Sequence, residues 1–195
     1  MRNQRCGPIR ASVLLAVLAL AACAGMPNQV STANRTPVPS NMGNRMVEQY
    51  ANGVAAFDRG DFATAYKILR PLAAAGIAPA PVKIGRIYAN GYVVERNCDN
   101  AFRWYRRAAG QGQPNSMHNL AWIYALGHGV AVDRARAYAW LTLAIMYYPD
   151  DDPKLGLARR QLNDMAVPLH SDDMCHASKL IGAWNAALKA RAHGP

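Results

Sequence analysis

A 36-residue unit occurs twice in succession, and it constrains the fold more than any other feature of the sequence. Residues 80–115 align with residues 116–151 without a gap. The positions identical in the two copies are Ile87/Ile123, Tyr88/Tyr124, Ala89/Ala125, Gly91/Gly127, Val94/Val130, Ala101/Ala137, Trp104/Trp140 and Ala108/Ala144. A period of this length is typical of solenoid proteins, in which each structural unit buries its apolar face only against its neighbours.

Each copy contains two predicted helices joined by a glycine-containing turn. In the first helix, Ile84, Ile87 and Tyr88 recur at the i, i+3, i+4 spacing of one apolar face, and a glycine follows as a helix stop. The second helix follows Asn97 in one copy and Asp133 in the other, and both residues are good N-caps. Each copy is therefore predicted to form an antiparallel helix hairpin.

These hairpins resemble the Sel-one-like repeats, a family related to the tetratricopeptide repeat but with a longer turn. The segments that carry the resemblance are Ile87-Tyr88-Ala89-Asn90-Gly91, Trp104-Tyr105-Arg106-Arg107-Ala108-Ala109-Gly110-Gln111-Gly112, and Gly127-His128-Gly129-Val130-Ala131-Val132-Asp133 leading to Ala137 and Trp140. The first copy departs from the family at Val93, where the second loop glycine usually stands. The resemblance implies a scaffold whose concave side, formed by the first helix of each hairpin, holds partners.

The same period extends beyond the two copies and defines the expected fold. Residues 46–76 read as an earlier hairpin with a shorter turn, so that the repeat array covers residues 46–151. Two further amphipathic helices in residues 152–192 are expected to form a terminal capping hairpin. We therefore expect an all-α protein, a right-handed α-solenoid of about four antiparallel helix hairpins.

The first 22 residues have the pattern of an export signal. A basic leader is followed by an uncharged apolar run from Ala11 to Ala22, which is too short to span a bilayer as a helix. The run ends in Leu-Ala-Ala before Cys23, and this resembles a bacterial lipobox, which implies lipidation of Cys23 and cleavage before it. Ordinary cleavage after Ala24, with the loss of Cys23, is the alternative reading.

The residues after the signal indicate how the folded part would be attached. Residues 23–45 are rich in Pro, Asn, Ser and Thr, which predicts a lipidated, disordered tether. Ala24 stands where aspartate usually marks retention at the inner membrane, so the resemblance to lipoproteins implies an outer-membrane protein facing the periplasm. We therefore expect an exported protein of the cell envelope, which excludes nucleic acid as a partner.

Two cysteines, Cys98 and Cys175, remain in the folded part for an oxidising compartment. They are predicted to lie two hairpins apart, and stacked helices are about 10 Å apart. A disulfide needs Cα atoms within about 7 Å. Either the terminal hairpin folds back over the array and the disulfide forms, or the two thiols stay apart.

No residue pattern indicates an enzyme, a metal site or a cofactor. The histidines have no metal-ligand spacing with carboxylates or cysteines. Ser116 and His118 lack the third group and the strained turn that nucleophilic catalysis uses. The only glutamates are Glu48, early in the first hairpin, and Glu95, in a loop, and they give poor support for a glycan-cleaving acid. We expect no catalytic residue, no bound metal and no cofactor.

The charge of the chain suggests an anionic ligand as an alternative to a protein partner. Without the three leader arginines, 19 basic side chains remain against 12 acidic ones, a net charge of +7. Arg103, Arg106 and Arg107, with Lys83 and Arg86 on the facing helix, are candidates for a basic patch that binds anionic envelope glycan or lipopolysaccharide. A solvated helix face is the alternative interpretation.

The leading functional hypothesis is a non-enzymatic, membrane-tethered adaptor that binds a protein of the envelope. The candidate contact residues on the first helices of the hairpins are Lys83, Arg86, Asn90, Asn119 and Trp122. Trp122 lies outside the apolar stripe of its helix, where an exposed tryptophan is a suitable binding anchor. Packing of Trp122 under the terminal hairpin, and a bracing role for Asn119 within its own hairpin, are the alternatives.

Overall fold

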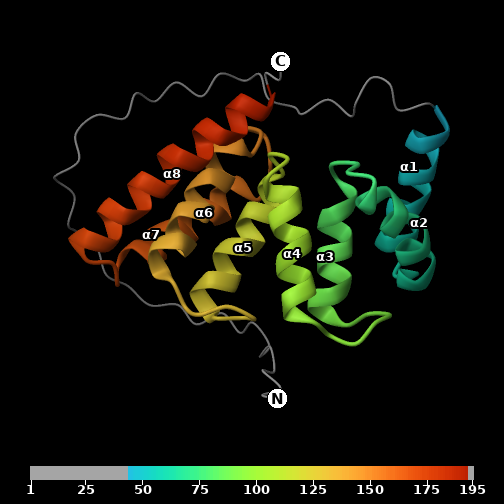
Figure 1. Cartoon of the computed structure of the whole chain (residues 1–195), viewed down its shortest axis with the longest axis horizontal. Helices are drawn as coiled ribbons and strands as arrows, with labels where there is room; N and C mark the ends of the chain where they lie inside the picture. Colours follow the sequence, from blue (N-terminus) through green and yellow to red (C-terminus); the bar gives the residue numbers. More distant parts are fainter. Residues whose placement is uncertain (1–43, 193–195) are drawn as a thin grey trace.

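The computed structural model describes residues 44–192, and this part of the chain is entirely helical in its regular structure. The helices follow one another along an elongated array (Figure 1). Their bounds are α1 Asn44–Asp58, α2 Phe62–Ala74, α3 Ala80–Asn90, α4 Cys98–Ala109, α5 Pro114–Leu126, α6 Arg134–Tyr147, α7 Leu155–Ala166 and α8 Ser171–Ala192. The predicted signal, Cys23 and most of the predicted tether lie outside the described residues, and α1 begins two residues earlier than expected.

Three consecutive hairpins make up most of the array. The helices α1 and α2, α3 and α4, and α5 and α6 pack on each other, and α2–α3 and α4–α5 contacts join neighbouring hairpins. This arrangement is the α-solenoid that the sequence predicts. Helices α1, α3 and α5 form one layer, which we call the A layer, and α2, α4 and α6 form the B layer.

The ends of the helices follow from individual residues of the repeat. The side chains of Asp61, Asn97 and Asp133 accept hydrogen bonds from the backbone N–H three residues later, at 3.1, 2.8 and 2.8 Å. Each of these bonds satisfies an amide that has no partner within its helix. Gly91 and Gly127 end α3 and α5 with φ angles of 69° and 70°, a left-handed conformation that glycine adopts without strain.

A small residue in the A-layer helix faces a large residue of the B-layer helix in each hairpin. A Cβ atom on Gly53 would lie 2.6 Å from the Leu69 side chain, and one on Gly85 would lie 2.7 Å from the Tyr105 ring. The repeat-equivalent pair in the third hairpin is Ala121 with Leu141, and both are fully buried. The two helices of each hairpin can approach closely because these A-layer positions are small.

The C-terminal helices differ from a repeat hairpin. Both α7 and α8 pack on α6, and they make little contact with each other. Figure 1 shows α8 running obliquely across α6. Trp184 of α8 stacks on Trp140 of α6 with ring centroids 4.2 Å apart, and the Tyr147 hydroxyl donates to Asn185 at 3.1 Å. The expected terminal hairpin is therefore replaced by two helices that separately cover α6, and the Trp140–Trp184 stack is part of the α6–α8 contact.

None of the helices between Asn44 and Ala192 combines the length and the apolar character that a membrane-spanning helix needs.

Replacement of Gly85 by alanine tests the small–large pairing. We expect Gly85→Ala to lower the free energy of unfolding by about 1–3 kcal/mol, the usual cost of adding a methylene to a packed core. Alanine favours a helix over glycine by about 1 kcal/mol, so a net loss must come from the Tyr105 contact. Denaturant unfolding followed by circular dichroism measures the change.

Gly182→Ala on α8 is the matched control. No atom lies within 4 Å of a Cβ at Gly182, so we expect this substitution to stabilise the protein by up to about 1 kcal/mol. Equal stabilisation by both substitutions would contradict the proposed packing constraint.

Candidate interaction surface

Two of the predicted contact residues, Lys83 and Arg86, join the first two hairpins. The Lys83 ammonium group lies 2.8 Å from the Asp58 carboxylate, and both Lys83 and Arg86 lie over the Phe57 ring, at 4.5 and 5.0 Å from its centroid. The Asn90 side chain donates to the backbone carbonyl of Arg86 at 2.8 Å. The α3 side chains therefore hold α1 and α3 together, a role that the sequence analysis did not foresee.

Helix α5 has a different exposed side, because it contains no charged residue. Asn115, Asn119, Trp122 and Leu126 follow one another at spacings of four, three and four residues, which places them on one face. The repeat-equivalent pairs on α3 and α5 are Lys83 with Asn119, Arg86 with Trp122, and Asn90 with Leu126. The positions that carry Lys83 and Arg86 on α3 thus carry Asn119 and Trp122 on α5, and the position of Asn90 carries Leu126.

The first turns of α5 are tied to the end of α6 and the start of α7. His118 Nδ1 lies 3.1 Å from the Tyr148 hydroxyl, which in turn donates to Asn115 Oδ1 at 3.3 Å. Lys154 Nζ donates to the same Asn115 oxygen at 2.7 Å. Asn115 and His118 are therefore engaged within the fold, and they leave the later part of the α5 stripe as the candidate surface.

The remaining part of the stripe is Asn119, Trp122 and Leu126, which we call the α5 surface. Asn119 is half-buried, and its side chain makes no hydrogen bond within residues 44–192. Trp122 is half-buried and is not among the residues packed against either hydrophobic core. Leu126 is 43% exposed, so an apolar side chain stands at the end of this surface. These three side chains are the remaining candidates for a partner contact on α5.

The three arginines predicted on α4 are exposed, and two of them have neighbours that fix their position. Arg106 lies 5.7 Å from the Phe102 ring centroid and Arg107 lies 5.9 Å from the Trp104 ring centroid. Within residues 44–192, the direct ion pairs are Lys83–Asp58 and Arg136–Asp133, so none of them includes an α4 arginine. Asp99, four residues before Arg103, is the acidic side chain of α4 itself.

Two backbone carbonyl groups, 36 residues apart in the sequence, each accept a hydrogen bond from an arginine side chain. Arg107 Nη2 donates to the Ala74 carbonyl at 2.8 Å, and Arg191 Nη1 donates to the Gly110 carbonyl at 3.2 Å. The repeat-equivalent of Arg107 is Leu143, which cannot donate, and α8 supplies Arg191 in its place. Sequence reasoning missed Arg191 because it lies outside the repeat, although the 36-residue period does relate the two acceptors.

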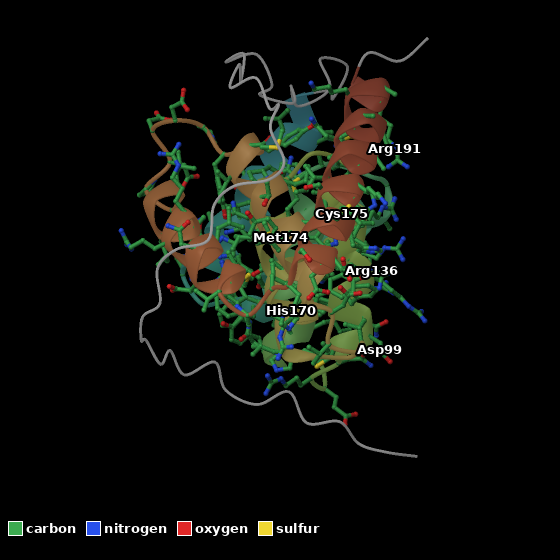
Figure 2. The ribbon with its side chains drawn as sticks, turned by 90° about the vertical axis from the view of Figure 1, so that its left-hand side faces the viewer. Asp99, Arg136, His170, Met174, Cys175 and Arg191 are labelled. Atoms are coloured by element: carbon green, nitrogen blue, oxygen red, sulfur yellow. The ribbon has the colours of Figure 1, made fainter. Side chains whose placement is uncertain are left out.

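Cys175 corrects one alternative left open by the sequence. It lies on the first turns of α8 (Figure 2), where it is exposed and its thiol is free. The disulfide between Cys98 and Cys175 is therefore not present. The cysteines lie near the N-terminal ends of α4 and α8, whereas Arg191 and Gly110 bring the C-terminal ends of these helices together.

The described residues offer no group of three or more His, Cys, Asp or Glu side chains that could hold a metal ion. Ser116 is fully buried, and its hydroxyl has no hydrogen-bond partner in this part of the chain. His118 points its Nδ1 towards Tyr148, so the pair does not form a nucleophile with its base. The burial of Ser116 and the contact of His118 with Tyr148 instead belong to the packing of α5 against the end of α6.

Burial lowers the pKa of His118 from its ordinary value of about 6.5, and the positive charge of Lys154 acts in the same direction. A hydrogen bond with Gln161 opposes this shift. The unfolded chain therefore binds a proton at His118 more readily than the folded chain does. The contribution of neutral His118 to stability is complete above about pH 6.5 and is lost as the pH falls below this value.

We expect the free energy of unfolding to decrease between about pH 7.5 and pH 5, and His118→Asn to make this decrease smaller. Denaturant titrations of both proteins across this range provide the measurement. Burial also lowers the pKa of His128, so His128→Asn serves as the comparison for a histidine outside the Tyr148 network. An unchanged pH slope in the His118 variant would show that this side chain does not titrate as its burial requires.

Comparison with known proteins agrees with this geometry. Residues 79–113 and 114–146 match the family model described as Sel1 repeat. The chain is 30% identical over 112 residues to the alginate biosynthesis protein AlgK of Azotobacter vinelandii, which covers 56% of this chain and 24% of that protein. The resemblance to Sel-one-like repeats expected from the sequence is confirmed.

A solved structure also shares the fold. It is a protective antigen present in uropathogenic Escherichia coli strains, described as displaying an SLR fold, and it superposes with a TM-score of 0.64 at 24% identity. The match covers 75% of this chain and 31% of the antigen. The chain thus spans about a quarter of the curated relative and about a third of the solved one.

Proposed function

We propose that this Sel1-repeat protein is a non-enzymatic adaptor of the bacterial cell envelope that binds a protein partner through the α5 surface. Sel1 repeats are typically protein-interaction scaffolds, and no enzyme family is indicated for this chain. The observation that carries the proposal is the contrast between α3 and α5. Equivalent positions hold neighbouring hairpins together on α3, whereas Asn119, Trp122 and Leu126 have no such role on α5.

The chemistry of the α5 surface suits a protein partner. A tryptophan beside a leucine offers apolar area that loses contact with water on binding, and tryptophan is enriched among residues that dominate binding energy. The Asn119 amide adds donors and an acceptor for the backbone of a bound segment. Since α5 carries no charge, we expect affinity for this surface to depend weakly on salt.

Attachment to the outer membrane is part of the same proposal. The leader in residues 1–22 and the lipobox before Cys23 support export and lipidation, and the composition of residues 23–45 supports a tether. A coil of about 20 residues spans about 25 Å on average, so the array would stand off the membrane surface. The partner is then a protein that reaches the periplasmic side of the envelope.

Site-specific photocrosslinking in cells tests the α5 surface. A photoreactive amino acid at Leu126 should give a discrete crosslinked protein, and the same amino acid at Leu157 of α7 should not. Leu157 is the matched control because its exposed fraction of 45% is close to the 43% of Leu126. Equal crosslinking from both positions would contradict the proposal, and Cys23→Ala provides the mislocalised control.

The affinity of the crosslinked partner then gives a quantitative test. We expect Trp122→Ala to weaken binding by about 30-fold, which corresponds to a hot-spot loss of about 2 kcal/mol. Leu157→Ala should leave the affinity within about twofold of the parent protein, since small surface changes away from a hot spot cost little. Equal affinities of the Trp122→Ala and parent proteins would exclude this residue as the anchor.

A further inference from the structure

Four exposed arginines form a row along one side of α4. Arg106 and Arg107 follow Arg103 by three and four residues, so each adjoins Arg103 on the exposed surface of the helix. Consecutive helical residues are about 100° apart, so Arg106 and Arg107 lie on either side of Arg103. Arg191 of α8 continues the row, because its guanidinium group reaches the carbonyl of Gly110 at 3.2 Å (Figure 2 shows Arg191 near the end of α8). We call these residues the arginine row.

Gly110 explains how a side chain from another helix can extend the row. Gly110 lies four residues after Arg106, one helical turn further along the same face. A Cβ atom at this position would lie 2.9 Å from Arg191 Nη1. The Arg191 guanidinium therefore occupies the space that a side chain at position 110 would fill.

Contacts within the fold hold three of these guanidinium groups in place. Arg106 lies over Phe102, and Arg107 lies over Trp104 while it donates one N–H to the Ala74 carbonyl. Arg191 uses one N–H on Gly110 in the same way. A guanidinium group has five N–H donors, so each arginine keeps donors for a ligand. Arginines that are already positioned lose less conformational entropy when they bind.

Positive charge exceeds negative charge around the row in the described part of the chain, although Asp99 precedes Arg103 by four residues on α4. None of the four arginines belongs to either ion pair between Asn44 and Ala192. The helices α2, α4, α6 and α8 together carry ten basic and three acidic side chains, whereas α1, α3, α5 and α7 carry five and three. The excess positive charge is shared between α4 and α8, which bear the arginine row with six basic and three acidic side chains, and α2 and α6, which carry four basic side chains and no acidic one.

We infer that the arginine row binds a linear acidic polysaccharide, whose carboxylates pair with these guanidinium groups. A planar guanidinium group matches a carboxylate through two parallel hydrogen bonds, and a row of such groups favours a polymer over a single anion. This binding goes beyond the adaptor role of the α5 surface and does not depend on Trp122.

A membrane surface fits these residues less well than a soluble polymer. Peripheral membrane binding combines basic residues with apolar side chains that enter the bilayer. Among the described residues, the large hydrophobic side chains that are exposed lie on neither α4 nor α8; they are Met46, Val47, Tyr92, Val93, Leu126, Val132, Leu157 and Val167. The arginine row thus offers charge without an insertion surface.

Binding of the full chain to sodium alginate, a polyuronate, tests the inference. We expect Arg103→Glu/Arg106→Glu to weaken binding about tenfold or more, and Arg191→Ala to weaken it about threefold, with a strong dependence on salt. The matched control is Arg159→Glu/Arg160→Glu on α7, which changes the net charge equally at two exposed arginines outside the row. This control should retain binding within about twofold.

Several outcomes would overturn the inference. Equal losses in the two double variants would show attraction by net charge alone. Binding to phosphatidylglycerol vesicles without binding to alginate would identify a lipid surface, and equal binding to neutral dextran would exclude recognition of carboxylates. Thermal unfolding of each variant confirms that the fold is retained. Trp122→Ala should bind alginate normally, so failure of the adaptor proposal and failure of this inference remain distinguishable.

Discussion

The distance between the two helices of each hairpin depends on a small residue in the A layer facing a large residue in the B layer. Gly53 and Gly85 have no space for a Cβ atom, because the side chains of Leu69 and Tyr105 fill it. Interiors are packed to crystal-like density, so an added methyl group must displace a neighbour. The constraint recurs at one place in each hairpin, and this fixed approach allows successive hairpins to present equivalent positions on one side of the array.

Equivalent positions need not have equivalent roles, and this difference supports the functional proposals. On α3, Lys83 and Arg86 are used to join α1 and α3. On α5, the corresponding residues are Asn119 and Trp122. Neither residue is charged, so neither can form an ion pair like that of Lys83 with Asp58. The repeat thus supplies the frame, and departures from the repeat supply a neutral surface on α5 of the A layer and an arginine row on α4 and α8.

The fold could be predicted from the sequence because it is encoded by local and periodic signals. The caps at Asn97 and Asp133 and the stop at Gly91 act within a few residues, and apolar spacing alone identifies the hairpins. The site could be predicted only in part. The contact of Arg191 with Gly110 joins residues 81 positions apart and lies outside the repeat period, so no sequence pattern indicates it. The separate packing of α7 and α8 on α6 likewise depends on tertiary contacts.

A double-mutant cycle between Gly85 and Tyr105 tests the packing constraint most directly. The third hairpin combines alanine with leucine at the equivalent positions, Ala121 and Leu141. We therefore expect Gly85→Ala to be less harmful when Tyr105→Leu removes the ring, with a favourable coupling free energy of about 1 kcal/mol or more in denaturant unfolding. Additive effects of the two substitutions would contradict the claim that this pair sets the approach of the helices.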